Sequence, residues 1–131
     1  MDIIHNGSQT AGKANPANFA GGVRRDVQVV HDLPSRIAAS HVSFEPNART
    51  AWHTHPLGQT LYITAGRGWV QRWGGPKEEV KTGDIVWFPP GEKHWHGGTS
   101  TSAMSHFAFV ETLDGNAAEW MEHVSDEQFN G

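Results

Sequence analysis

The sequence predicts a single all-β domain folded as a sandwich or barrel. The chain has 131 residues, which suits one domain with one hydrophobic core. After residue 22 it consists of short apolar runs separated by turn residues, a pattern typical of antiparallel sheets. Fifteen Gly and seven Pro match the frequent turns that such a fold requires.

Strands are expected wherever β-branched, aromatic or alternating apolar residues stand between turn signals. In chain order they are Val23–Val30, Ile37–Phe44, Arg49–His55, Gln59–Ala65, Gly68–Trp73, Glu78–Lys81, Asp84–Phe88, His94–Gly97 and Ala103–Thr112. Hairpin turns are expected at Gly66–Gly68 and Gly74–Pro76. A further turn at Lys81–Asp84 places Gly83 where a positive φ is favoured.

The two ends of the chain differ from the middle in their expected secondary structure. Residues 1–22 are rich in Gly, Asn and Ala and predict an irregular arm without the apolar segment of a signal peptide. The extension over 113–131 is ambiguous, because Asn116 and Glu119 offer a helix capping box while residues 120–124 alternate as in a strand. We favour a strand near 119–124, followed by one helical turn capped by Ser125.

Composition and charge exclude several classes of function. A net charge of −4 and a pI of about 6.1 give no reason to expect binding to nucleic acid or to an anionic membrane. No apolar run approaches the length of a membrane span, and the absence of Cys excludes disulfides and thiol chemistry. A cytoplasmic location is therefore expected. Nine His in so short a chain indicate metal or proton chemistry.

Four residues have the spacing of a metal site. Side chains two apart on a strand share a face, so His53 and His55 are expected to point the same way. Gln59 opens the next strand, which can bring its amide oxygen beside them. His94 follows a Pro-Pro-Gly turn and supplies a fourth group from a remote strand. Mixed imidazole and oxygen ligation suits Mn²⁺, Fe²⁺, Co²⁺, Ni²⁺ or Zn²⁺.

The two segments that contain these four residues resemble the two motifs of the cupin superfamily. The first, G-x5-H-x-H-x3-E-x6-G, is matched from Asn47 to Gly66, and the second, G-x5-P-x-G-x2-H-x3-N, from Gly83 to Gly98. The resemblance covers roughly residues 36–112. It implies one cupin domain over 1–131, a small antiparallel β-barrel of the double-stranded β-helix or jelly-roll type, as a homodimer or homotetramer.

The sequence departs from these motifs at three positions. Asn47 replaces a Gly, which is a mild change because Asn tolerates the left-handed conformation, and Gly98 replaces an Asn. Gln59 replaces the Glu ligand and removes one negative charge from the ligand shell. The site is then expected to bind its metal less tightly, yet to be a stronger Lewis acid and a poorer redox centre.

A more specific resemblance is to the bacterial cupin-type hydroxynitrile lyases. It is carried by residues 50–60, by residues 90–97 and by the stretch from Trp120 to Val124. Members of that family are manganese-dependent and cleave, or in reverse form, (R)-cyanohydrins such as mandelonitrile. The resemblance implies Mn²⁺ as the first choice of metal, a small-molecule substrate, ligands at His53, His55, Gln59 and His94, and a catalytic acid/base at His106.

His106 has two rivals for the catalytic role. It lies on a strand that is apolar on both faces, so alternation alone does not tell whether it points inward. His96 shares the parity of His94 and is the main alternative, whereas His41 is expected to point outward. Substrate contacts are expected from small or apolar inward residues, with His96 beside them: Ser40, Val42, Thr50, Leu61, Ala108 and Val110.

The sequence thus favours a metal-dependent hydroxynitrile lyase in which a histidine moves the proton and the metal stabilises charge. Two alternatives of other kinds remain open at this point. One is another metal-dependent cupin, a dioxygenase or an isomerase. The other is a non-catalytic cupin that binds a small ligand.

Overall fold

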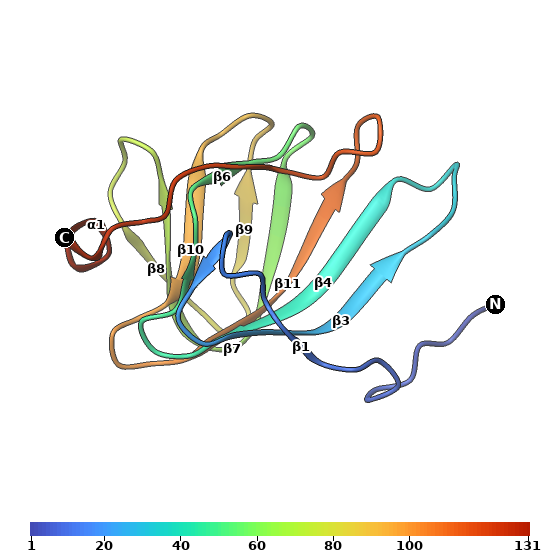
Figure 1. The fold of residues 1–131 in the computed structure, drawn as a ribbon, viewed down its shortest axis with the longest axis horizontal. Coiled ribbons are helices and arrows are strands. Elements are labelled where there is room, and N and C mark those ends of the chain that lie inside the picture. The colour runs from blue at the N-terminus through green and yellow to red at the C-terminus, as the bar shows by residue number, and fades with distance from the viewer.

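The computed structural model describes all 131 residues and consists of one curled antiparallel sheet system (Figure 1). Its elements are β1 (Gly12–Lys13), β2 (Phe19–Ala20), β3 (Val23–Val30), β4 (Ile37–Phe44), β5 (Arg49–Thr50), β6 (His53–Thr54), β7 (Gln59–Arg72), β8 (Glu78–Lys81), β9 (Ile85–Phe88), β10 (His94–Gly98), β11 (Met104–Glu111), β12 (Glu119–Trp120) and α1 (Asp126–Asn130). The predicted all-β barrel is confirmed. No helix is long and apolar enough to cross a bilayer.

Strand β7 joins the two halves of the barrel. Its first half pairs with β11 and β9, and its second half pairs with β10 and β8. The first sheet continues from β11 through β4 and β3 to β1. The second continues from β10 through β5 to β2, with β6 and β12 beside it. A strand shared by both sheets lets the whole array curl around one interior.

The predicted hairpin at Gly66–Gly68 is wrong, because β7 runs through it without reversing. Gly66 instead has a φ of 77°, beside a register shift between β7 and β11. A Cβ on Gly66 would lie 2.0 Å from the carbonyl oxygen of Ala103, and one on Gly68 would lie 2.3 Å from that of Gly97. These glycines therefore let the strand bend and change partners, rather than turn back. The turns at Gly74–Pro76 and around Gly83 are present as expected.

The predicted strand Arg49–His55 is interrupted at Ala51 and Trp52. The Ala51 amide donates to the carbonyl of Asn18, and the Trp52 amide donates to that of Glu122. Both ends of the chain thus supply backbone partners at the break. Only the tertiary fold brings these segments together, so alternation within the strand could not reveal the interruption.

The C-terminal extension crosses the barrel above β6, in red in Figure 1, and ends in α1. The expected strand is shorter than predicted, Glu119–Trp120, while the capping box formed by Ser125 and Gln128 is present. Val124 and Phe129 of this extension form a second small apolar cluster with Trp52 and Trp95. Trp52 therefore packs against the chain's own C-terminal extension.

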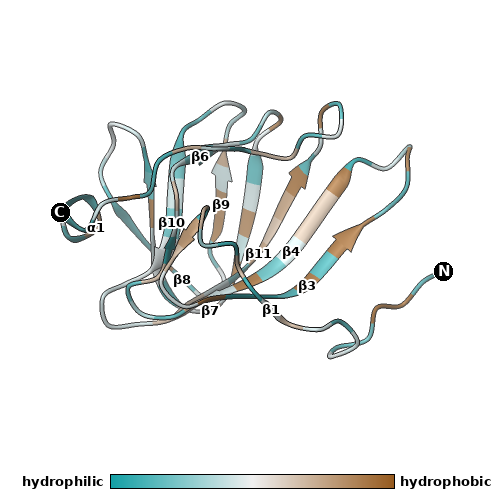
Figure 2. Cartoon of the chain, in the orientation of Figure 1, coloured by the Kyte–Doolittle hydropathy of each residue, from teal (hydrophilic) through white to brown (hydrophobic).

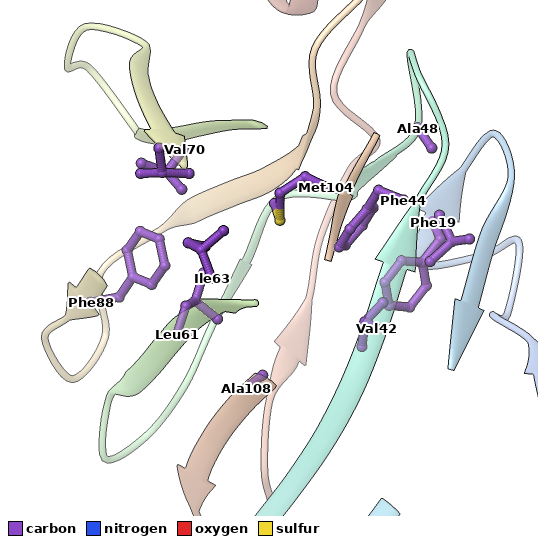
Figure 3. Packing of buried hydrophobic residues seen from close by; sticks show 12 residues of the cluster. Phe19, Val42, Phe44, Ala48, Leu61, Ile63, Val70, Phe88, Met104 and Ala108 are labelled. Atoms are coloured by element: carbon purple, nitrogen blue, oxygen red, sulfur yellow. The ribbon is translucent and has the colours of Figure 1, made fainter. Parts of the chain in front are cut away.

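The main apolar cluster fills one part of the barrel interior (Figure 3). Figure 2 shows hydrophilic and hydrophobic residues interspersed along the strands, as two-sided sheets require. The cluster draws on both sheets: Phe19, Val23, Val42, Phe44, Ala48, Leu61, Ile63, Val70, Val80, Phe88, Met104 and Ala108. Phe19 shows that the N-terminal arm, although mostly irregular, contributes to the core through β2.

Candidate metal centre and cavity

Five histidines meet inside the barrel. His53 of β6 pairs directly with His94 of β10, and His96 lies two residues further along β10 on the same face. His55 follows β6, and His106 comes from β11, where it alternates inward with Met104 and Ala108. All five side chains are buried. The inward orientation of His106, which alternation had left open, is thereby decided.

Three of these rings are held by backbone carbonyls. Nδ1 of His53 lies 2.8 Å from the Ala51 oxygen, Nδ1 of His55 lies 2.7 Å from that of Ala117, and Nδ1 of His94 lies 2.8 Å from that of Glu92. A carbonyl oxygen only accepts, so each Nδ1 carries the proton and donates it. In the neutral rings every Nε2 therefore presents a lone pair, the arrangement that metal-binding histidines use.

Gln59 adds an oxygen to these lone pairs. Its Oε1 lies 3.1 Å from Nε2 of His94, and its side chain also lies beside His55, whose Nε2 is buried without a hydrogen-bond partner. Because Nδ1 of His94 already holds the proton, two acceptor atoms face each other at this contact. A cation that accepts electron pairs from both atoms satisfies this donor set, so the residues present fit a metal ion.

Aromatic packing holds two of the rings in place. The Phe88 ring stacks on His94 with 3.6 Å between centroids, and Trp120 stacks on His53 with 4.4 Å between centroids. Each ring is thus held both by its carbonyl and by a neighbouring aromatic face. Such support preserves the direction of a ligand nitrogen before any ion binds.

His96 and His106 form a pair of a different kind. Nε2 of His106 lies 3.0 Å from Nδ1 of His96, so one nitrogen donates a proton to the other. The outer nitrogens, Nδ1 of His106 and Nε2 of His96, are buried and have no partner. Whichever way the shared proton points, one outer nitrogen carries a hydrogen and the other carries a lone pair.

Three buried histidines, His53, His94 and His96, offer ring nitrogens that all lie within 4.8 Å of one another and could hold a metal ion. The sequence had predicted His55 and Gln59 in addition to His53 and His94, with His96 as a neighbour of the substrate. The ring of His55 lies 5.0 Å from that of His53 and 5.4 Å from that of His94. The predicted residues are therefore gathered at one place, and His96 lies closer to them than expected.

Burial favours the neutral form of every imidazole in this cluster. Desolvation lowers the pKa of His94 and of His106 to about 3, the latter helped by the charge of His41. It also lowers the pKa of His53 and His96 well below the usual value, and that of His55 less strongly. Neutral rings are the form that binds metals and accepts protons.

A cavity of about 240 Å³ opens directly onto this cluster and is lined mainly by apolar side chains. His53, His55, Gln59, His96 and His106 border it. All the residues expected to contact substrate lie along its wall except Leu61, which is buried in the main apolar cluster: Ser40, Val42, Thr50, His96, Ala108 and Val110. Thr50 also accepts a hydrogen bond from the amide of His96.

Several residues of the cavity wall were not expected from the sequence. They come from the N-terminal half and from the C-terminal extension, and include Phe19, Arg25, Gln28, Phe44, Ala117 and Trp120. For Arg25 the sequence did contain a signal of inward orientation, since Arg25 shares the parity of Val23 on an otherwise apolar strand face. The others had none, because their place depends on how the two ends fold over the barrel. His41 lies on the outer face, bonded to Asp26 and Thr64.

Comparison with known proteins agrees with this architecture. A family model described as a cupin domain matches residues 40–110. Over 129 residues the chain is 57% identical to an (R)-mandelonitrile lyase of Granulicella tundricola, an alignment that covers 98% of this chain and 98% of that protein.

Solved structures extend the similarity to the whole fold. A cupin-like protein from Thermotoga maritima aligns with a TM-score of 0.85 and 35% identity, covering 99% of this chain and 96% of its own. A polyketide cyclase from Streptomyces resistomycificus aligns with a TM-score of 0.76, covering 99% and 91% of the two chains. At 16% identity, that match concerns the fold alone.

Proposed function

The chain belongs to the cupin family, and we propose that it is a metal-dependent hydroxynitrile lyase. Its reaction would be the reversible cleavage of (R)-cyanohydrins such as mandelonitrile to an aldehyde and HCN. The 57% identity to an (R)-mandelonitrile lyase over nearly the full length supports the reaction class. The structural observation that carries the proposal is the opening of one small apolar cavity onto both the converging lone pairs and the His96–His106 pair.

The ligands we propose are His53, His55, Gln59 and His94. Each of these histidines has its Nδ1 proton committed to a carbonyl, which leaves Nε2 for a cation. His96 lacks such a carbonyl, and its Nδ1 faces His106 instead. The proposed ion is Mn²⁺, with Fe²⁺, Co²⁺, Ni²⁺ and Zn²⁺ as alternatives. When bound, it would supply Lewis-acid stabilisation of negative charge, undiminished by a carboxylate ligand.

His106 is the proposed acid/base. A neutral imidazole in contact with the cavity can accept the hydroxyl proton of a cyanohydrin, while its partner His96 holds the ring by their shared hydrogen bond. As the carbonyl forms, the C–C bond breaks and its electron pair leaves with cyanide. Cyanide then takes the proton from the imidazolium and departs as HCN, so the histidine returns to its neutral form.

The cavity fits a small substrate with an apolar body. Its volume of about 240 Å³ lies below the roughly 300–1,000 Å³ of pockets for drug-sized ligands, which matches a molecule with one aromatic ring. Val42, Ala108 and Val110 offer apolar wall for such a ring, and Ser40 and Thr50 offer hydroxyls. Expulsion of water from this space would strengthen the polar contacts at the reacting carbon.

Three measurements test the proposal. The purified protein is assayed for bound transition metal, then loaded with Mn²⁺ and assayed for mandelonitrile cleavage at pH 5–6. Rapid release of benzaldehyde is the expected result, and a metal-loaded protein without it would contradict the lyase assignment. Oxygen uptake with catechol- or flavonol-like substrates would instead identify a dioxygenase, and the absence of metal would leave a ligand-binding cupin.

We further propose that the protein is a homodimer or homotetramer, with contacts through the outer face of β4, β11, β7 and β9. Exposed apolar side chains gather there: Ile37, Tyr62, Ile85, Trp87 and Phe109. Tyr62 pairs with Ile85, and Thr60 lies between Trp87 and Phe109 in register, so the patch is continuous. A mainly apolar patch of this kind, with Glu111 opposite Ile37 at its edge, suits a second copy of the same surface. Light scattering tests this, with Trp87→Lys expected to yield monomers.

A further inference from the structure

The wall of the cavity carries one permanently charged side chain, Arg25, and no carboxylate. Its polar members are otherwise neutral: Gln28, Ser40, Thr50, Gln59 and four of the buried histidines. A bound divalent ion at the proposed ligands would add further positive charge and nothing to balance it. The positive charge in the cavity therefore favours binding of an anionic molecule.

Arg25 points into this cavity because of its position in the first sheet. It pairs with Val42 of β4, and Val42 pairs with His106 of β11, so the three residues form one row across neighbouring strands. Cross-strand partners share a face, and strands lie about 4.8 Å apart, so the Arg25 backbone is roughly 10 Å from that of His106. The preceding residue, Arg24, points the other way and is exposed.

No protein group neutralises Arg25. Its Nε is buried and has no hydrogen-bond partner, and no carboxylate lies within ion-pair distance of it. The adjacent Asp26 is held on the outer face, where its carboxylate binds Nδ1 of His41. A buried Nε–H without an acceptor is costly, unless a ligand in the cavity supplies one.

We propose that Arg25 is a specificity-determining residue that binds a carboxylate at the far end of the substrate. The inference rests on the proposed lyase function and defines its substrate class, namely cyanohydrins of aldehydes that carry a carboxylate. The reacting hydroxyl would lie at His106 while the guanidinium receives the carboxylate about one aromatic ring away. Such a fork of N–H donors matches the two oxygens of a carboxylate and discriminates against neutral groups of equal size.

The test compares substrates that differ only in charge. The cyanohydrins of 3- and 4-formylbenzoate are cleaved in parallel with those of the corresponding formylbenzamides, which have the same shape and no charge. For the metal-loaded protein we expect kcat/KM to favour at least one carboxylate over its amide by tenfold or more. In Arg25→Gln this ratio is expected to fall about tenfold, and in Arg25→Lys it is expected to fall less. Arg24→Gln is the matched control and should keep the ratio of the wild type.

Binding gives a second readout that does not need turnover. Benzoate and benzamide are titrated calorimetrically into the metal-loaded wild type and Arg25→Gln, with thermal unfolding as a check on folding. Benzoate is expected to bind about tenfold more weakly to Arg25→Gln, whereas benzamide binds both alike. Equal benzoate affinities would place the carboxylate on the metal and overturn the role of Arg25.

The remaining outcomes separate this inference from the proposed function. Cleavage of mandelonitrile without a carboxylate preference in either isomer would retain the lyase and refute the carboxylate subsite. An equal slowing of charged and neutral substrates in Arg25→Gln would mean that Arg25 acts on the departing cyanide, which also refutes it. Failure to cleave any cyanohydrin would refute the lyase, while benzoate binding would still decide whether Arg25 binds a carboxylate.

Discussion

The cluster contains two groups of histidines that differ in how their protons are held. In His53, His55 and His94, a backbone carbonyl fixes the proton on Nδ1 and leaves one defined lone pair. In the His96–His106 pair, the rings hold each other, and the outer nitrogens have no protein partner. The first arrangement suits a group that must bind a cation in one geometry, and the second suits a group that must gain and lose a proton.

This difference shows how one barrel interior can separate two tasks among residues of the same type. All five rings are buried, and desolvation lowers the pKa of each, so burial does not distinguish them. The distinction comes from the second nitrogen of each ring, and from whether a carbonyl is within reach of it.

Removal of a carbonyl-held histidine should have the largest effect. In His94→Ala the proposed site loses one imidazole, and its neighbour Gln59 loses its contact. We expect loss of bound metal, measured by elemental analysis, together with loss of mandelonitrile cleavage. His5→Ala is the matched control, since His5 is exposed in the N-terminal arm and should leave both properties intact.

The paired histidine should separate activity from metal content. For His106→Ala we expect kcat to fall roughly 100- to 10,000-fold, the usual contribution of general acid–base catalysis, with metal content unchanged. Loss of metal in this variant would instead make His106 a ligand and remove the distinction between the groups. His123→Ala, at an exposed position, serves as the control.

Acid should destabilise the metal-free protein through both groups. The pKa of His106 is lowered to about 3 in the fold, whereas the unfolded chain titrates near the ordinary value of about 6.5. Between these values only the unfolded state takes up the proton. The contribution of His106 to the free energy of unfolding is therefore fully present above about pH 6.5 and decreases as the pH falls below it. Each lowered histidine contributes a slope of up to about 1.4 kcal/mol per pH unit.

Urea unfolding from pH 7.5 to pH 4.5 measures this slope. In His106→Phe one titrating ring is absent, so the slope should be shallower by about 1.4 kcal/mol per pH unit. The exposed His31→Gln should keep the slope of the wild type. A slope that does not change in His106→Phe would mean that this ring is protonated in the folded protein.

The smallest expected effect concerns the neutral oxygen ligand. Gln59→Glu restores a carboxylate beside His94 and His55, which should tighten metal binding about tenfold or more and slow cleavage by about tenfold. Competition with a chelator measures the first quantity, and steady-state kinetics measures the second. Unchanged kinetics would make the neutral charge of Gln59 incidental to the reaction.

The sequence alone predicted much of this protein, because alternation along strands and the spacing of a few residues are local properties. Strands Val23–Val30, Ile37–Phe44 and Glu78–Lys81 lie where their apolar patterns placed them, and the helical turn begins at its capping box. Asn47 has a φ of 70°, as expected for a residue that replaces a glycine. The spacing from His53 to Gln59, and on to His94, grouped side chains that the fold indeed gathers.

What the sequence could not give depends on contacts between distant segments. The bend of β7 at Gly66 depends on the approach of β11, a contact that the local sequence does not show. The local pattern of glycines therefore predicted a turn. The carbonyl that holds His55 comes from Ala117, 62 residues away, and the contact between His96 and His106 needs two strands from different sheets. Strand register and chain closure are set by packing over the whole barrel. Only the tertiary structure could therefore decide which nitrogens are held, which are free, and that Arg25 faces the same cavity.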